Sequence, residues 1–102
     1  MSTDTLTEIQ KSTELDSEHE ARYRILIHND DVTPFDFVIM VLLRVFKLSG
    51  EIAEHVTMTA HIKGVALVMV RPKAEAENLI VKAHMAARLE GFPLTFSIEP
   101  DE

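Results

Sequence analysis

The chain has 102 residues, 46% of them hydrophobic, and a net charge of −7, which suits one compact domain with a core but not two domains. The acidic balance argues against a protein that binds the phosphate backbone of nucleic acids, because such proteins are normally basic. The chain has no cysteine, which excludes disulfide bonds and thiolate metal sites. No apolar run is long enough to span a bilayer, and the polar N-terminus is unlike a secretory signal, so we expect a cytoplasmic protein.

The first twenty residues differ in composition from the rest of the chain. Residues 1–20 carry six acidic side chains, one lysine and few apolar residues, a composition typical of disordered segments. We predict a disordered acidic N-terminal extension over 1–20 and one core domain over 21–102. A ragged terminus and a functional tether both fit this composition, and the residues alone favour the first.

A strand followed by a helix is predicted at the start of the core domain. Residues 23–28 predict a strand with the apolar side chains of Tyr23, Ile25 and Ile27 on one face. The segment 29–32 ends this strand, because the short polar side chains of Asn29, Asp30 and Asp31 bond to the backbone and tolerate turns. Thr33 is predicted to accept from the exposed N–H groups of a helix that has Pro34 at its first position.

This first helix is predicted to run to about Lys47. It carries ten apolar residues, more than one core-facing stripe requires. Either the helix is packed on most sides or its first turns line a binding site. Since a domain this small can hardly bury a helix completely, we favour a site.

Another helix and a strand follow. The second helix is predicted over 51–59, with Ile52, Val56 and Thr59 on one face. Residues 65–70 are continuously apolar, and we interpret them as the central strand of a sheet.

The third helix is predicted to open at Pro72 and to end at Gly91. Residues 94–98 alternate as an edge strand with one solvent-facing side does. The predicted order is βααβαβ. The fold class is therefore a two-layer α/β (α+β) domain, in which a three-stranded antiparallel sheet is packed with three helices.

Catalytic and metal sites find little support. The chain has no Gly-rich phosphate loop, no cysteine nucleophile and no motif around a serine. The candidate ligands match no standard zinc spacing or calcium loop; they are His28, Asp30, Asp31, His55 and His61. We predict a binding protein with no metal and no cofactor, and a metal-dependent hydrolase stays a distant alternative.

Four other side chains carry expectations of their own. His84 falls on the polar side of the third helix and is expected to be solvated. Met58 and Met69 are expected to pack in the core. His61 is predicted to follow a helix C-terminus, where a histidine can interact favourably with the helix dipole, and that position alone fits a structural role and a ligand role equally well.

Three segments carry a family resemblance. They are YRILIHNDDVTPFDFV at residues 23–38, HIKGVA at 61–66 and GFPL at 91–94. In register over about residues 22–99, they resemble the ClpS family of N-degron (N-end rule) adaptor proteins. The resemblance implies an adaptor, not an enzyme, that binds the free N-terminus of proteins beginning with Phe, Tyr, Trp or Leu. It further implies delivery to a AAA+ unfoldase, ClpA or a relative, for degradation by ClpP, with residues 1–20 taking part in the hand-off.

The resemblance also implies a site with two parts. A free α-amine is an ammonium with three donors and no acceptor, so taking it from water is costly unless acceptors surround it. The implied acceptors are Asn29, Asp30, Asp31 and His61. The implied walls of an apolar pocket for the first side chain are Thr33, Phe35, Val38, Thr57, Ala60 and Leu94.

Two wall positions, Phe35 and Thr57, depart from the family pattern, which has Met there. We therefore predict a pocket selective for aromatic first residues, with altered binding of Leu. Ala74 and Leu79 stand where the family has an acid and a lysine on the unfoldase-docking face, so no docking residue is assigned. We expect a monomer without nucleic-acid or membrane partners. A ClpS-like domain that docks on the unfoldase but has lost N-degron recognition is the alternative.

Overall fold

A computed structural model describes residues 21–101 of the chain. The predicted extension, residues 1–20, lies outside the described residues, as does Glu102. The elements follow the predicted order, and they are β1 (Arg22–His28), α2 (Phe35–Arg44), α3 (Gly50–Lys63), β2 (Val65–Pro72), α4 (Lys73–Leu89) and β3 (Thr95–Pro100). The predicted α+β class, three helices with one three-stranded antiparallel sheet, is confirmed.

The strands pair antiparallel in the order β2-β1-β3. β1 is therefore the central strand, and the prediction that residues 65–70 form the central strand is wrong. Ala66 and Val68 are buried, whereas Val65 and Leu67 are 39% and 43% exposed, because alternate side chains of a strand point to opposite faces of the sheet. A continuous apolar run thus does not require a strand to have neighbours on both sides.

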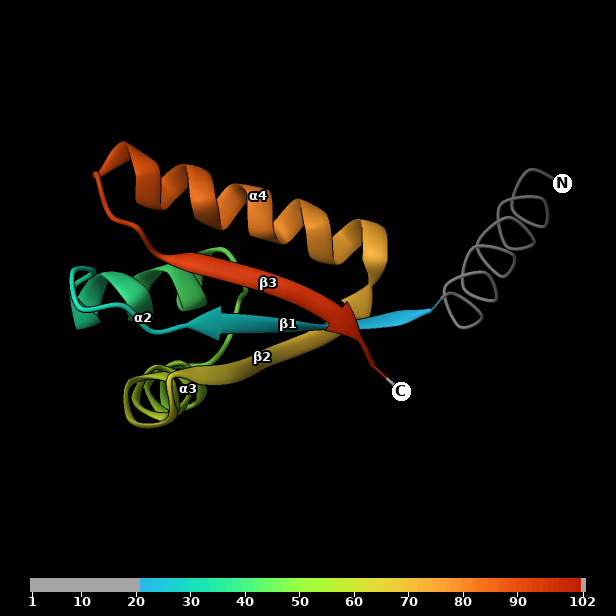
Figure 1. Ribbon diagram of the computed structural model, residues 1–102, viewed down its shortest axis with the longest axis horizontal. Coiled ribbons are helices and arrows are strands. Elements are labelled where there is room, and N and C mark those ends of the chain that lie inside the picture. Colours follow the sequence, from blue (N-terminus) through green and yellow to red (C-terminus); the bar gives the residue numbers. More distant parts are fainter. Residues whose placement is uncertain (1–20, 102) are drawn as a thin grey trace, which may run out of the picture.

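Helix α4 lies along one face of the sheet, and α2 and α3 lie near the end where β1 stops (Figure 1). The core contains Ile25 and Ile27 of β1, 0% and 1% exposed. Facing them, α4 buries alanines, whose small side chains let a helix approach closely. Pro72 precedes α4 as predicted, and Gly91 ends it with a positive φ of 77°. Among residues 21–101, no helix is long and apolar enough to cross a membrane.

Helix α2 is shorter than predicted, because it ends at Arg44 and not near Lys47. Lys47 has a φ of 60°, and the Leu48 N–H donates to the Leu42 carbonyl over 3.1 Å. A left-handed residue followed by such a bond closes a helix C-terminus even without glycine. The apolar letters that continue to residue 46 therefore overstated the length of the helix.

The start of α2 also differs from the prediction. Pro34 is the cap residue and not the first helical residue, and no side chain caps the helix. The Thr33 hydroxyl donates to Asp30 over 2.9 Å, so the prediction that Thr33 accepts from the helix N–H groups is wrong. The preceding acid forms stronger, charge-assisted hydrogen bonds with Thr33, and these draw it into the loop.

Helix α3 is longer than predicted, and Ser49 caps it by accepting from the Ile52 N–H over 3.3 Å. Its buried residues are Ala53, Val56, Thr57 and Ala60. The predicted face was wrong for Ile52, which is 51% exposed, because the helix presents mainly small residues to its neighbours. His61 lies within the last turn and does not follow it.

The two methionines for which core packing was expected have different environments. Met69 packs against the core as predicted. Met58 is 46% exposed, so that prediction is wrong. Met58 directly follows the buried Thr57 on α3, and adjacent residues of a helix do not share a face.

Candidate functional site

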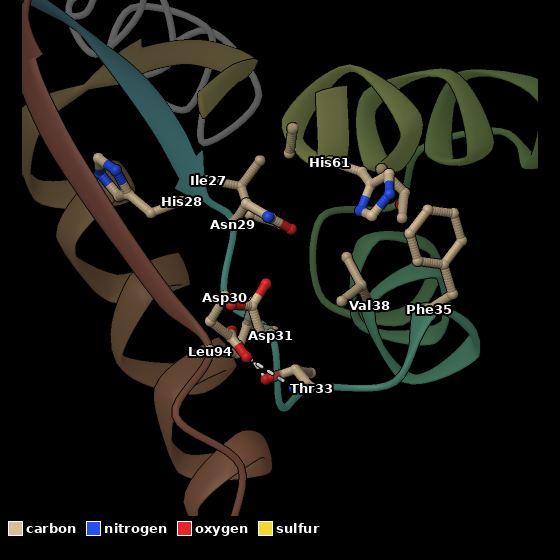
Figure 2. A pocket seen from close by; sticks show the side chains of 12 residues that line it. Ile27, His28, Asn29, Asp30, Asp31, Thr33, Phe35, Val38, His61 and Leu94 are labelled. Atoms are coloured by element: carbon tan, nitrogen blue, oxygen red, sulfur yellow. Dashed lines mark hydrogen bonds between the residues drawn. The ribbon is translucent and has the colours of Figure 1, made fainter. Parts of the chain in front are cut away.

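One cavity of about 230 Å³ lies between the end of β1, helices α2 and α3 and the segment before β3. Figure 2 shows side chains from these four parts of the chain converging on it. Ten of its lining residues are the ten site residues predicted from the sequence: Asn29, Asp30, Asp31, Thr33, Phe35, Val38, Thr57, Ala60, His61 and Leu94. The structure thus places all ten around one space, and Ile27 and His28 complete the lining.

Asp30 organises the loop at one side of this cavity. Its Oδ1 atom accepts from the backbone N–H groups of Val32 and Thr33 over 2.8 and 2.6 Å. Its Oδ2 atom accepts from the Thr33 hydroxyl over 2.9 Å (Figure 2). Burial alone raises the pKa of Asp30, but hydrogen bonds from Thr33 and Val32 and the charge of Arg88 outweigh it, so the pKa is lowered. The carboxylate is therefore charged at neutral pH beside the cavity.

A hydrogen bond between main-chain groups joins this loop to helix α3. The Asn29 N–H donates to the Gly64 carbonyl over 2.9 Å. Gly64 caps α3 with a φ of 90°, and its own N–H donates to Ala60. Only glycine adopts this left-handed conformation without strain. The bond sets the end of β1 beside the last turn of α3, and the side chains of Asn29 and His61 point toward one another across the cavity (Figure 2).

Two rings meet at the outer part of the cavity. Phe35, the first residue of α2, packs edge to face against His61 with 5.2 Å between ring centroids and 86° between ring planes. Phe35 is 41% exposed and His61 is also exposed. Such a pair holds both rings in a preferred relative orientation. The polar residues Asn29 and His61 and the ring of Phe35 thus form the cavity mouth.

The interior of the cavity is apolar and buried. Val38, Ala60 and Leu94 are 8%, 3% and 1% exposed. Thr57 is also buried, and its hydroxyl donates to the Ala53 carbonyl over 2.7 Å. The cavity therefore combines hydrogen-bond acceptors at its mouth with a buried, mostly apolar interior. Such an arrangement can bind a ligand that has a charged donor beside an apolar group.

The sequence interpretation missed the residues of α4 that hold the Leu94 wall in place. Arg88 donates from one nitrogen to the carbonyls of Phe92 and Leu94, over 2.7 and 2.8 Å. One turn earlier, His84 Nε2 accepts from the Phe96 N–H over 2.9 Å. Their spacing of four residues places both on one side of the helix, which is a faint signal that no local motif reinforces.

His84 is therefore not the solvated residue that the sequence predicted. It is half-buried beside β3. Burial first, and then the positive charge of Arg88, lower the pKa of His84. Both effects favour the neutral ring, which the acceptor role of Nε2 requires.

His28 is a candidate metal ligand from the sequence, and the structure gives it a different role. Its Nε2 atom lies 2.6 Å from the Ser97 hydroxyl on β3, and its ring points away from His61 and Phe35 (Figure 2). Within the described part of the chain, no three His, Asp or Glu side chains are grouped so that they could hold a metal ion.

Comparisons with known proteins agree with the resemblance seen in the sequence. The family model for the ATP-dependent Clp protease adaptor protein ClpS matches residues 18–97. The chain is 45% identical over 80 residues to ATP-dependent Clp protease adapter protein ClpS 2 of Rhizobium meliloti (strain 1021), covering 78% of this chain and 79% of that protein. It is 42% identical over 78 residues to ATP-dependent Clp protease adapter protein ClpS of Oleidesulfovibrio alaskensis, covering 76% and 75%.

A solved structure shares the fold. The structure of Agrobacterium tumefaciens ClpS2 bound to L-phenylalaninamide superimposes with a TM-score of 0.79 and 38% sequence identity, covering 81% of this chain and 100% of that one. The family model matches well over half of the chain, and the curated relatives are aligned over most of their length. The chain therefore belongs to the ClpS family of Clp protease adaptors, which are not enzymes.

Proposed function

We propose that this adaptor binds the free N-terminus of proteins whose first residue is Phe, Tyr, Trp or Leu and delivers them to a AAA+ Clp unfoldase, ClpA or a relative, for degradation by ClpP. The observation that carries the proposal is one cavity with an acceptor-rich mouth and an apolar interior. The ligand of Agrobacterium tumefaciens ClpS2, L-phenylalaninamide, supports it, because that molecule has an α-amine beside an aromatic side chain.

The mouth supplies groups that suit an ammonium. Asn29 offers a carbonyl oxygen, and His61 offers a ring nitrogen. A carboxylate has about four lone-pair sites, and the loop already uses three of those on Asp30. Asp30 therefore acts mainly through its charge and its hold on the loop, and Asp31 adds a second negative charge. An acetylated terminus lacks the charge and two of the donors, so it would leave acceptors unpaired.

The interior suits a bulky first side chain. Burying a Leu or Phe side chain contributes roughly 1.5–3 kcal/mol, and the walls Val38, Ala60 and Leu94 are already buried. We propose that Phe35 at the rim and Thr57 inside keep the pocket selective for aromatic residues and alter the binding of Leu. Comparable affinity for peptides that begin with Phe, Leu and Ile would contradict this preference.

A peptide titration tests recognition of the N-terminus. A fluorescent peptide with a free N-terminal Phe is titrated with the full chain and compared with its N-acetylated twin. We expect binding of the free peptide and at least a tenfold loss on acetylation, because a hydrogen bond to a charged group contributes about 1.5–3 kcal/mol. Equal binding of both peptides, or of neither, overturns the proposal.

A degradation assay tests the delivery step. A substrate that begins with Phe is incubated with ClpA, ClpP and ATP, with and without the adaptor. We expect faster degradation when the adaptor is present, and no acceleration for a substrate whose N-terminus is acetylated. An adaptor that binds the unfoldase but neither peptide would support the alternative, a docking domain that has lost N-degron recognition. We also propose that the adaptor is a cytoplasmic monomer and that residues 1–20 take part in handing the substrate to the unfoldase.

A further inference from the structure

Thr57 stands out within the apolar interior of the cavity. Among residues 21–101 it is the one buried residue with a polar side chain, and it is 3% exposed. It lines the cavity together with Val38 and Leu94. A buried hydroxyl needs a partner, and Thr57 has one in the Ala53 carbonyl, 2.7 Å away. Thr57 therefore needs no ligand to satisfy its donor, but it places a polar group in an otherwise apolar interior.

The hydroxyl of Thr57 can still accept hydrogen bonds after it has donated to Ala53. A hydroxyl has one donor and two acceptor lone pairs, and the single donor is committed to Ala53. The lone pairs can accept from a ligand. Because the donor is already satisfied, a ligand without a matching group leaves no donor of Thr57 unpaired.

The position of Thr57 relative to the mouth limits which ligands can reach it. Thr57 and His61 are four residues apart on α3, so they share a face of the helix and lie about 6 Å apart along its axis. His61 is exposed at the mouth, whereas Thr57 is buried. A first residue with its ammonium at His61 and its side chain directed inward extends toward Thr57. A tyrosine side chain reaches from its backbone about as far as one helical turn rises, roughly 5.4 Å. Its phenolic end therefore comes to the depth of Thr57.

We propose that the Thr57 hydroxyl accepts a hydrogen bond from the phenolic O–H of an N-terminal Tyr, and so favours Tyr over an apolar ring of equal size. This inference rests on the proposed function, since it places the ammonium at the mouth. Phenylalanine still binds, because Thr57 tolerates the lack of a donor. Among the buried walls, Val38, Ala60 and Leu94 offer a phenol no side-chain acceptor, and the other wall hydroxyl, that of Thr33, is held in the loop by Asp30.

The test compares peptides that differ only in the first residue. Dissociation constants are measured for Tyr, Phe and 4-methylphenylalanine, whose methyl group matches the phenolic oxygen in size but donates no hydrogen bond. For the wild-type chain we expect Tyr to bind roughly 2- to 12-fold more tightly than 4-methylphenylalanine, the range of one net hydrogen bond. In Thr57→Val, which keeps the shape and removes the hydroxyl, we expect this ratio to fall to about one.

Thr59 provides a matched control on the same helix. Its hydroxyl donates to the His55 carbonyl over 2.8 Å, the same kind of bond that Thr57 makes, but Thr59 does not line the cavity. Thr59→Val therefore removes a similar backbone hydrogen bond and should leave the Tyr ratio unchanged. Thr57→Ser, which keeps the hydroxyl, should retain the preference for Tyr. If Thr57→Val does not fold, Thr57→Ala takes its place, with the same expected ratio of about one.

The outcomes separate this inference from the function on which it rests. If free-amine peptides bind but the Tyr ratio stays the same in the variants that lack the Thr57 hydroxyl, the Thr57 inference is wrong and N-terminus recognition stands. A wild-type ratio near one has the same meaning. If no free-amine peptide binds the wild-type chain, the proposed function itself fails and the inference fails with it.

Discussion

The two ends of the cavity are built in different ways. The loop at one side of the mouth depends on hydrogen bonds within a short stretch of chain, the three that Asp30 accepts from Val32 and Thr33. The interior depends on packing between α2, α3 and the segment that carries Leu94, which are far apart in sequence. A short sequence motif can therefore specify the loop beside the mouth, whereas the complete fold is needed to bring His61 to that loop and to form the interior.

The largest expected effect comes from breaking the mouth at Asp30. Asp30→Ala removes three hydrogen bonds, so we expect a loss of about 2–3 kcal/mol in the free energy of unfolding, measured in urea. Peptide binding should fall with it, because Asn29 and Thr33 flank this loop. Asp31→Ala is the control, since the Asp31 side chain takes part in none of the hydrogen bonds formed within residues 21–101. Equal unfolding free energies for the two variants would contradict the organising role of Asp30.

Acid should reproduce part of the Asp30→Ala effect. The folded-state pKa of Asp30 lies below its ordinary value of 3.8. The carboxylate therefore stabilises the fold above that value, and this contribution is lost as the pH falls through the lower, folded-state pKa. The difference in stability between wild type and Asp30→Ala should be full at neutral pH and should shrink below about pH 4. If the difference in unfolding free energy between the two proteins stays constant down to pH 2, the charge of Asp30 does not stabilise the fold.

His61→Ala should affect the mouth without affecting the fold. His61 is exposed, so we expect an unchanged unfolding transition. Affinity for a peptide with free N-terminal Phe should fall about 10- to 100-fold, the equivalent of one hydrogen bond to a charged group. His55→Ala is the control, because His55 is an exposed histidine of the same helix that does not line the cavity. If both variants bind like wild type, the ammonium is held elsewhere.

Gly64→Ala should loosen the joint between the end of β1 and the end of α3, which brings Asn29 beside His61. A side chain at a φ of 90° costs roughly 1–2 kcal/mol, although an added Cβ meets no atom within 4 Å. We expect a matching loss of stability and weaker peptide binding. Gly50→Ala is the control, because Gly50 begins α3 without a positive φ and also has open space around it. The same loss in both variants would mean that conformation is not the cause.

The smallest expected effect concerns the interior and appears as a pH dependence. The folded-state pKa of His84 lies below its ordinary value of 6.5. Between the two values the unfolded chain binds a proton that the folded chain does not, so stability falls as the pH is lowered through this window. His84→Gln keeps an acceptor for the Phe96 N–H and removes the titration. The slope of unfolding free energy against pH should be shallower in this variant between pH 6.5 and 5. Identical slopes in the two proteins would show that the titration of His84 does not affect stability.

The same contrast explains how much could be predicted from the sequence. The element order followed from the hydrophobic patterns and the turn residues between them. The ten cavity residues followed from the family resemblance, which the run from Asn29 to Pro34 and the later His61 carry most clearly. The role of Thr33 was wrong, because a short polar side chain can donate into a loop as readily as it can cap a helix. The place of β2 at the sheet edge and the contacts of Arg88 and His84 were missed. They depend on which strand lies beside which helix, and no local pattern encodes that.

The hydrogen bond between Asn29 and Gly64 gives the site a built-in reporter. The Asn29 amide can exchange its hydrogen with solvent only when the end of β1 separates from the end of α3. A ligand held by both Asn29 and His61 spans the same junction, so occupancy and closure stabilise each other. Hydrogen exchange at this one amide therefore registers occupancy of the mouth, independently of how the first side chain fits the interior.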